Sequence, residues 1–94
     1  MQKVFAVFDL KAAAYGHPIF APSRGLAVRS FGEAVANPKS DLNRYPGDFT
    51  LAEIGEYDAA TGKISGYANP VPVCTAAAML EELRANKIVP EEVA

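Results

Sequence analysis

The stretch Lys3–Leu10, KVFAVFDL, decides the fold. Its valines and phenylalanines form an apolar run that is too short for a stable helix and suits a strand covered on both faces. We therefore predict a central β-strand here. A second strand is predicted for Phe49–Tyr57, FTLAEIGEY, because its apolar and polar residues partly alternate. Together these segments predict a sheet at the centre of the protein.

The residues that follow the second strand predict a hairpin. Asp58–Lys63 has the composition of a loop, because Asp58 can accept hydrogen bonds from turn amides and Gly62 can adopt a positive φ. Ile64–Ala68 would then return as the partner strand. The segment Asn69–Val73, NPVPV, can continue only as an edge strand, because its two prolines lack the N–H groups that a central strand needs.

Two helices are predicted on either side of this strand region. Ser23 can cap a helix that ends near Asn37–Pro38, and Thr75 can cap a second one that runs to about Asn86. Apolar and small residues recur at helical spacing along one face of the first helix: Leu26, Ala27, Ser30, Phe31, Ala34 and Val35. Between the first strand and the first helix, Lys11–Pro22 is predicted to be an extended loop, because a glycine and two prolines interrupt it.

These elements give one α+β domain over residues 1–94, a small and mostly antiparallel sheet of about four strands with two helices. Residues 88–94 are predicted to form a frayed C-terminal tail. A domain of 94 residues has a small core, so we expect a homo-oligomer that buries further apolar surface.

The composition excludes several classes of function. Cys74 and His17 are the only cysteine and the only histidine, which argues against an internal disulfide, a metal site and a cysteine nucleophile with its base. Glu53 and Glu56 are interpreted as members of solvated faces. We therefore expect no enzyme activity and no cofactor. No apolar run approaches the roughly 20 residues that cross a bilayer, so a cytoplasmic protein without a membrane partner is expected.

The charge is unevenly distributed along the chain. The net charge is −2, whereas residues 1–47 carry +3 and the remainder carries −5. This polarity can make one face basic and the other acidic, or can support a head-to-tail contact between copies; it is equally compatible with charges scattered over a solvated surface.

One segment combines aromatic and basic side chains in the way that single-stranded nucleic acid requires, with rings that stack on bases and cations that meet phosphates. The candidate residues are Lys11, Tyr15, His17, Phe20, Arg24 and Arg29. Arg24 and Gly25 are unfavourable in a first helical turn, and a phosphate bound at Ser23–Gly25 would explain them. The alternative interpretation is that the rings fill the core or a subunit contact and that Arg29 pairs with Glu33 one turn away.

Longer stretches of the chain resemble the small nonstructural proteins of the gokushovirus branch of the microviruses. The resemblance lies in Lys3–Phe31, with its FDLK, AYG, PSRG and RSF motifs, and in Asp48–Gly62, DFTLAEIGEYDAATG. It implies a phage protein that binds DNA during genome replication or during the switch to single-stranded DNA for packaging.

The predicted function is therefore non-enzymatic binding of single-stranded DNA in the host bacterial cytoplasm. The alternative is a protein-interaction module that engages host replication proteins or viral assembly proteins through the apolar loop and the acidic second half.

Overall fold

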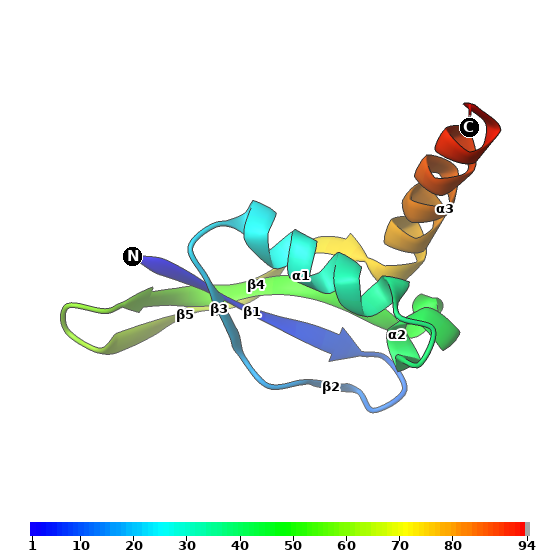
Figure 1. The fold of residues 1–94 in the computed structure, drawn as a ribbon. Coiled ribbons are helices and arrows are strands. Elements are labelled where there is room, and N and C mark those ends of the chain that lie inside the picture. Colours follow the sequence, from blue (N-terminus) through cyan, green and yellow to red (C-terminus); the bar gives the residue numbers. More distant parts are fainter. Residues whose placement is uncertain (94) are drawn as a thin grey trace.

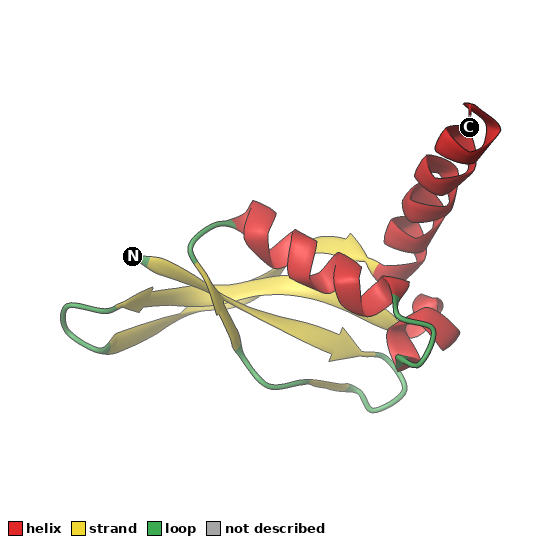
Figure 2. Ribbon diagram, viewed as in Figure 1, coloured by secondary structure: helices red, strands yellow, loops and turns green. Residues whose placement is uncertain are grey.

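The computed structural model describes the backbone of residues 1–93 and the side chains of residues 1–85. The strands are β1 (Gln2–Asp9), β2 (Ala14–Tyr15), β3 (Ile19–Ala21), β4 (Phe49–Asp58) and β5 (Lys63–Thr75). The helices are α1 (Arg24–Ala36), α2 (Asp41–Arg44), the short 3-10 helix η1 (Pro46–Asp48) and α3 (Ala76–Val93). Figure 1 follows them along the chain, and Figure 2 separates helices from strands by colour. The predicted α+β class is confirmed.

The sheet is antiparallel throughout, in the order β2-β1-β4-β5, and β3 also pairs with β1. Because β4 occupies one side of β1, β2 and β3 share the other side and act as one interrupted strand. The sheet therefore has the width of about four strands, as predicted, and it curls into a half-barrel. β1 and β4 are central, and the proline-containing β5 lies at an edge as predicted.

α1 lies across one face of the sheet and closes the core. Ser23 is its N-cap, and its hydroxyl accepts a hydrogen bond from the Leu26 amide. The buried side chains of α1 pack with Phe5 and Leu51 from the two central strands. Thr75 caps α3 in the same way, through the Ala78 amide. The first turns of α3 join the core through Ala76 and Leu80, and the helix then projects away from the sheet (Figure 1).

Irregular pairing interrupts both sides of β4 near Ile54. On the β1 side, Val4 pairs with Gly55 whereas Phe5 already pairs with Glu53, so Ile54 is an extra residue. On the β5 side, the register moves from Gly55–Gly66 to Glu53–Val71, and residues 67–70 of β5 are left over. Such bulges bend strands and redirect side chains. They place Tyr67 beside Glu53.

Three parts of the chain differ from the expectation. Residues 11–22 contain the short strands β2 and β3 within the predicted extended loop. The polar stretch after α1 forms α2, which Ser40 caps and which was not predicted. α3 continues to Val93, past its predicted end near Asn86, while Ala94 lies outside the described residues; fraying of residues 88–94 stays a prediction. The hairpin loop is confirmed, with Gly62 at a φ of 75°.

Candidate nucleic-acid interface

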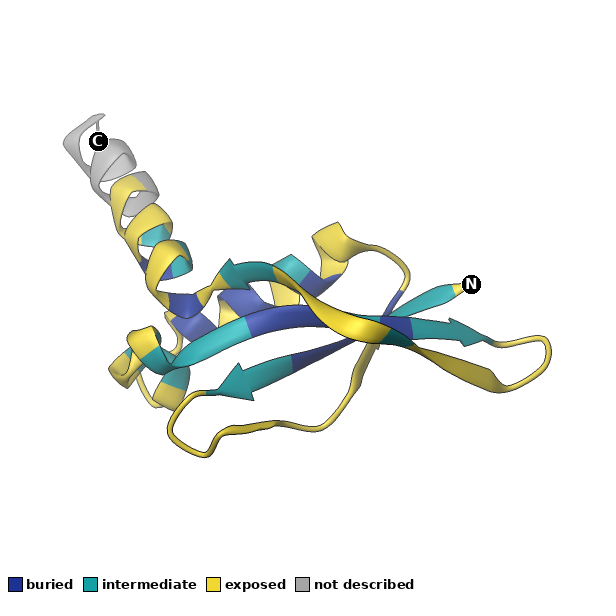
Figure 3. Ribbon diagram, turned by 180° about the vertical axis from the view of Figure 1, so that it is seen from behind, coloured by how far each residue is buried: buried dark blue, intermediate teal, exposed yellow. Residues whose placement is uncertain are grey.

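The two faces of the sheet have different surroundings. α1 covers one of them, while Figure 3 shows the opposite side of the strands with no helix over it. Successive side chains of a strand point to opposite faces, so the strand register assigns each residue to a face. We use the name helix-free face for the second one. Its side chains come from Val4, Ala6, Phe8, Tyr15, Phe20, Thr50, Ala52, Ile54, Tyr57, Ile64 and Pro72.

Two pairs of aromatic rings stand on the helix-free face. Phe8 and Tyr15 pair across β1 and β2 with ring centroids 4.9 Å apart, and Phe20 meets Tyr57 edge-on at 5.3 Å. Tyr15 and Phe20 each remain 45% exposed. Phe8 and Val4, the residue opposite Phe20, are four positions apart on β1, a spacing of about 13 Å. The face therefore offers two separate aromatic surfaces to a ligand.

The helix-free face carries no acidic residue among its strand positions. Asp9, Glu53, Glu56 and Asp58 all occupy the other set of alternating positions on β1 and β4. Asp9 is further engaged at the end of β1, where its carboxylate accepts hydrogen bonds from the amides of Lys11 and Ala12. The acidic residues that give the protein its negative net charge therefore do not lie on the strands of this face.

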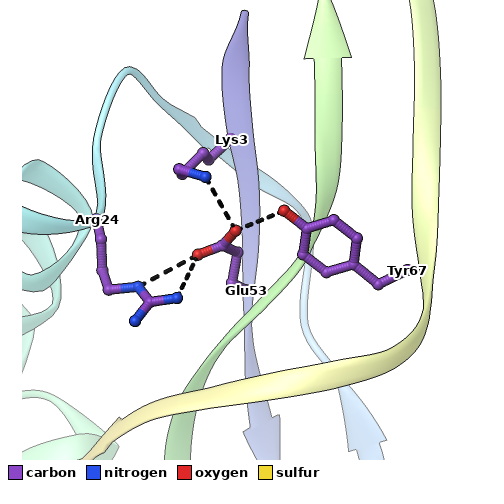
Figure 4. A network of polar contacts seen from close by, with 4 residues as sticks. All are labelled: Lys3, Arg24, Glu53 and Tyr67. Atoms are coloured by element: carbon purple, nitrogen blue, oxygen red, sulfur yellow. Dashed lines mark hydrogen bonds and ion pairs between the residues drawn. The ribbon is translucent and has the colours of Figure 1, made fainter.

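The helix-covered face holds a compact cluster of polar side chains around Glu53 (Figure 4). Arg24 donates two hydrogen bonds to one carboxylate oxygen of Glu53, from Nε at 3.2 Å and from Nη2 at 2.9 Å. Lys3 Nζ at 3.3 Å and the Tyr67 hydroxyl at 2.5 Å donate to the other oxygen. Glu53 is 3% exposed, so its charge is balanced by partners rather than by water.

These contacts shift the proton affinity of two members of the cluster. The hydrogen bond from Tyr67, followed by those from Arg24 and Lys3, holds the pKa of Glu53 below its ordinary value, although burial acts in the opposite direction. The same bond raises the pKa of Tyr67 to about 12, because ionised Tyr67 would lose a donor and face a carboxylate. Glu53 is therefore an ionised structural residue, and the expectation that it belongs to a solvated face is wrong.

The structure does not bring the six predicted binding residues together. Tyr15 and Phe20 lie on the helix-free face, and Lys11 and His17 lie in the exposed segments beside β2. Arg24 instead points to Glu53 on the covered side, which accounts for a cation in the first turn of α1 without any bound phosphate. The idea that Arg24 and Arg29 form one basic surface with the aromatic residues therefore needs correction.

Arg29 lies in a third place. It comes five positions after Arg24, so the two side chains leave the helix in directions about 140° apart around its axis. It lines a groove between α1 and α3 together with Val28, Met79 and Glu82. The described ion pairs do not include one between Arg29 and Glu33, so the alternative pairing from the sequence is not seen either.

The sequence interpretation missed Phe8 and Tyr57 as members of the aromatic surface. Both were assigned only to strands. Phe8 lies an even number of positions from Val4 and Ala6 of the same face, whereas Tyr57 lies an odd number of positions from Thr50 and Ala52, because the bulge shifts the alternation. Strand alternation could have shown that Phe8 points away from Phe5, but it could not show that Tyr57 meets Phe20. That contact depends on the bulge at Ile54.

Comparison with known proteins identifies a family. The sequence model of a family described as Phage ORF5 protein matches residues 2–79. No curated protein and no solved structure matches the chain. In addition, none of the described helices is long and apolar enough to cross a membrane.

Proposed function

Because the chain belongs to the Phage ORF5 protein family, we propose that this phage protein binds single-stranded DNA of the viral genome, without enzymatic activity, on the helix-free face. The observation that carries the proposal is the pair of exposed aromatic surfaces on strand positions free of carboxylates. Unpaired bases stack on such rings, each with about 1–3 kcal/mol of binding free energy. The finer identification with the gokushoviruses, and with replication or packaging in the host cytoplasm, is part of the same proposal.

The roles of the individual residues follow from their positions. Tyr15 and Phe20 stack bases, with Phe8 and Tyr57 holding the rings in place. His17, two residues after Tyr15, meets a phosphate. Lys11 is the second candidate cation, at the end of β1 where it lines a pocket with Asp9 and Asp48. Arg24 takes no part in binding, because its guanidinium is held by Glu53 on the covered face.

This distribution of charge predicts a weak dependence of affinity on salt. Each phosphate neutralised on a single strand contributes a slope of about −0.7 to the logarithmic salt dependence, so two or three contacts give a total slope between about −1.4 and −2.1. Stacking then supplies most of the binding free energy. An affinity that fell far more steeply would indicate a larger basic surface elsewhere on the protein.

The test is a fluorescence anisotropy titration of labelled oligothymidylate and of a labelled duplex at two salt concentrations. The proposal expects saturable binding of the single strand, much weaker binding of the duplex and the shallow salt dependence given above. The absence of binding to the single strand at low salt would reject it.

A protein-interaction role is the second candidate, and the groove between α1 and α3 favours it. The groove has a volume of about 430 Å³ and is lined by apolar side chains that include Val28, Met79 and Leu83. It could contact a second copy of the chain or a replication or assembly protein of phage or host. A pull-down from host lysate after nuclease treatment separates the two roles, because only protein-mediated capture survives the nuclease.

A further inference from the structure

A small apolar hollow opens on the helix-free face next to Phe20. Its volume is about 120 Å³, and its walls come from Pro18, Phe20, Ile54 and Ile64. Gly55 and Gly66, which pair directly across β4 and β5, form part of its lining. Ile64 is 60% exposed and Phe20 is 45% exposed, so these walls stand above the strands and the hollow is accessible.

The two glycines keep the floor of the hollow flat for different reasons. A Cβ on Gly55 would collide with the backbone carbonyl of Ser65, so close approach of the two strands demands glycine there. A Cβ on Gly66 would meet only the Ile54 carbonyl oxygen, at an ordinary contact distance of 3.9 Å. Strand geometry therefore tolerates a side chain at position 66, and glycine there leaves the hollow unfilled.

We propose that this hollow receives one unpaired base of the bound strand, inserted edgewise beside the Phe20 ring and above the Gly55–Gly66 backbone. The inference rests on the function proposed above and adds a single-base subsite to it. A planar base suits a site with an aromatic wall and a peptide floor, because it is thin enough to contact the Phe20 ring and the glycine backbone at the same time. Glu56, which follows Gly55 and pairs with Ser65, belongs by register to the covered face, so no strand carboxylate on the helix-free face repels the adjoining phosphates.

The subsite gives a physical reason for selectivity toward single strands. A base that is stacked and paired in a duplex must leave the helix before it can enter a hollow, and this costs free energy. An unpaired base has no partner to lose. The competing occupant is an apolar side chain of a protein partner. If the hollow served that role, filling it would not change the preference of the protein for strands with bases over abasic strands.

The experiment fills the hollow from its floor with Gly66→Val and, as a second variant, from its wall with Ile64→Phe. Gly47→Val is the matched control, since Gly47 has open space around its Cβ position and lies in η1, outside the hollow. Labelled oligothymidylate and an abasic oligonucleotide of the same length are titrated against each folded variant, with thermal melting to verify the fold.

We expect each filling variant to lose about tenfold in affinity for oligothymidylate, the effect of one lost stacked base, while binding to the abasic strand and the behaviour of Gly47→Val stay unchanged. If wild type binds oligothymidylate and both filling variants bind it equally well, the subsite is overturned but the proposed function stands. An equal loss on the abasic strand also overturns base insertion. If wild type binds neither strand, the proposed function fails and the subsite with it.

Discussion

The two faces of the sheet use their polar and aromatic residues in opposite ways. On the covered face, Lys3, Arg24 and Tyr67 all point to one buried carboxylate, so the charges are satisfied within the protein. On the helix-free face, aromatic rings stay half exposed with no carboxylate on the strands beside them. The comparison teaches that a basic residue and an aromatic residue that are close in the sequence can lie on opposite faces of the sheet. Alternation along β1 and β4 separates structural cations from a ligand surface.

The largest expected effect concerns the stability of the covered face. Glu53→Ala removes the acceptor of four hydrogen bonds and leaves three partners without it, which we expect to lower the free energy of unfolding by about 2–3 kcal/mol. Lys3 and Arg24 are partly exposed and can recover water, which keeps the loss at the lower end of the range for broken buried ion pairs.

Urea unfolding followed by circular dichroism measures this change. Glu56→Ala, at the neighbouring position of the same face of β4, is the control and should change stability by no more than about 0.5 kcal/mol. Equal effects of the two substitutions would show that Glu53 has no special role. Folded Glu53→Ala protein should keep its affinity for oligothymidylate.

A smaller effect, on binding rather than on stability, is expected on the helix-free face. Phe20→Ala removes one stacking ring and should weaken binding of oligothymidylate by about 1–3 kcal/mol, or roughly fivefold to 150-fold. Leu26→Ala serves as the control, because Leu26 lies on α1 and is 43% exposed, close to the 45% of Phe20. Anisotropy titration compares the two, and similar losses from both would break the distinction between the faces.

The Glu53 cluster should also make stability depend on pH at both ends. Because the folded pKa of Glu53 lies below its ordinary value of 4.5, its contribution is present above that value and is lost as the pH falls through the lower folded pKa. The folded pKa of Tyr67, about 12, lies above its ordinary value of 10.0, so its contribution is present below 10.0 and is lost as the pH rises through 12.

Ultraviolet titration of the tyrosines can detect this coupling. One of the four tyrosines should ionise near pH 12 in wild type, and Glu53→Gln should move that transition back toward the ordinary range. Tyr67→Phe should remove it altogether. An unchanged titration in Glu53→Gln would mean that the carboxylate does not control Tyr67.

The smallest effect is expected from a single cation. Lys11→Ala should reduce the slope of the logarithmic salt dependence for a single strand by about 0.7, the contribution of one phosphate. Arg29→Ala, in the groove between α1 and α3, should leave the slope unchanged. Titration of both variants at several salt concentrations measures this difference. A larger change of slope in Arg29→Ala than in Lys11→Ala would indicate that the strand binds on the side of the helices.

Local signals were sufficient to predict much of the fold. Side-chain caps at Ser23 and Thr75 fixed where two helices begin, Gly62 fixed the hairpin turn, and the prolines of β5 restricted that strand to an edge. Each of these features depends on neighbours within a few residues. α2 also has a local signal, the Ser40 cap, and it was missed because the helix has only four residues.

The candidate site was less accessible to sequence interpretation, because its geometry depends on distant partners. Arg24 and Glu53 are 29 positions apart, and they meet because α1 lies across the sheet that contains β4 (Figure 1). The Phe20–Tyr57 pair depends on the bulge at Ile54, which no local pattern marks. The aromatic members Tyr15 and Phe20 could be identified from composition, whereas the separation of the arginines from them could not.

The most direct test of the assigned face is amide chemical-shift mapping of ¹⁵N-labelled protein during titration with oligothymidylate. The account predicts that the largest shifts fall on Phe8, Tyr15, Phe20, Tyr57 and Ile64, with little change along α1. Shifts concentrated on Arg24, Arg29 and the rest of α1, or no shifts at saturating oligonucleotide, would contradict it.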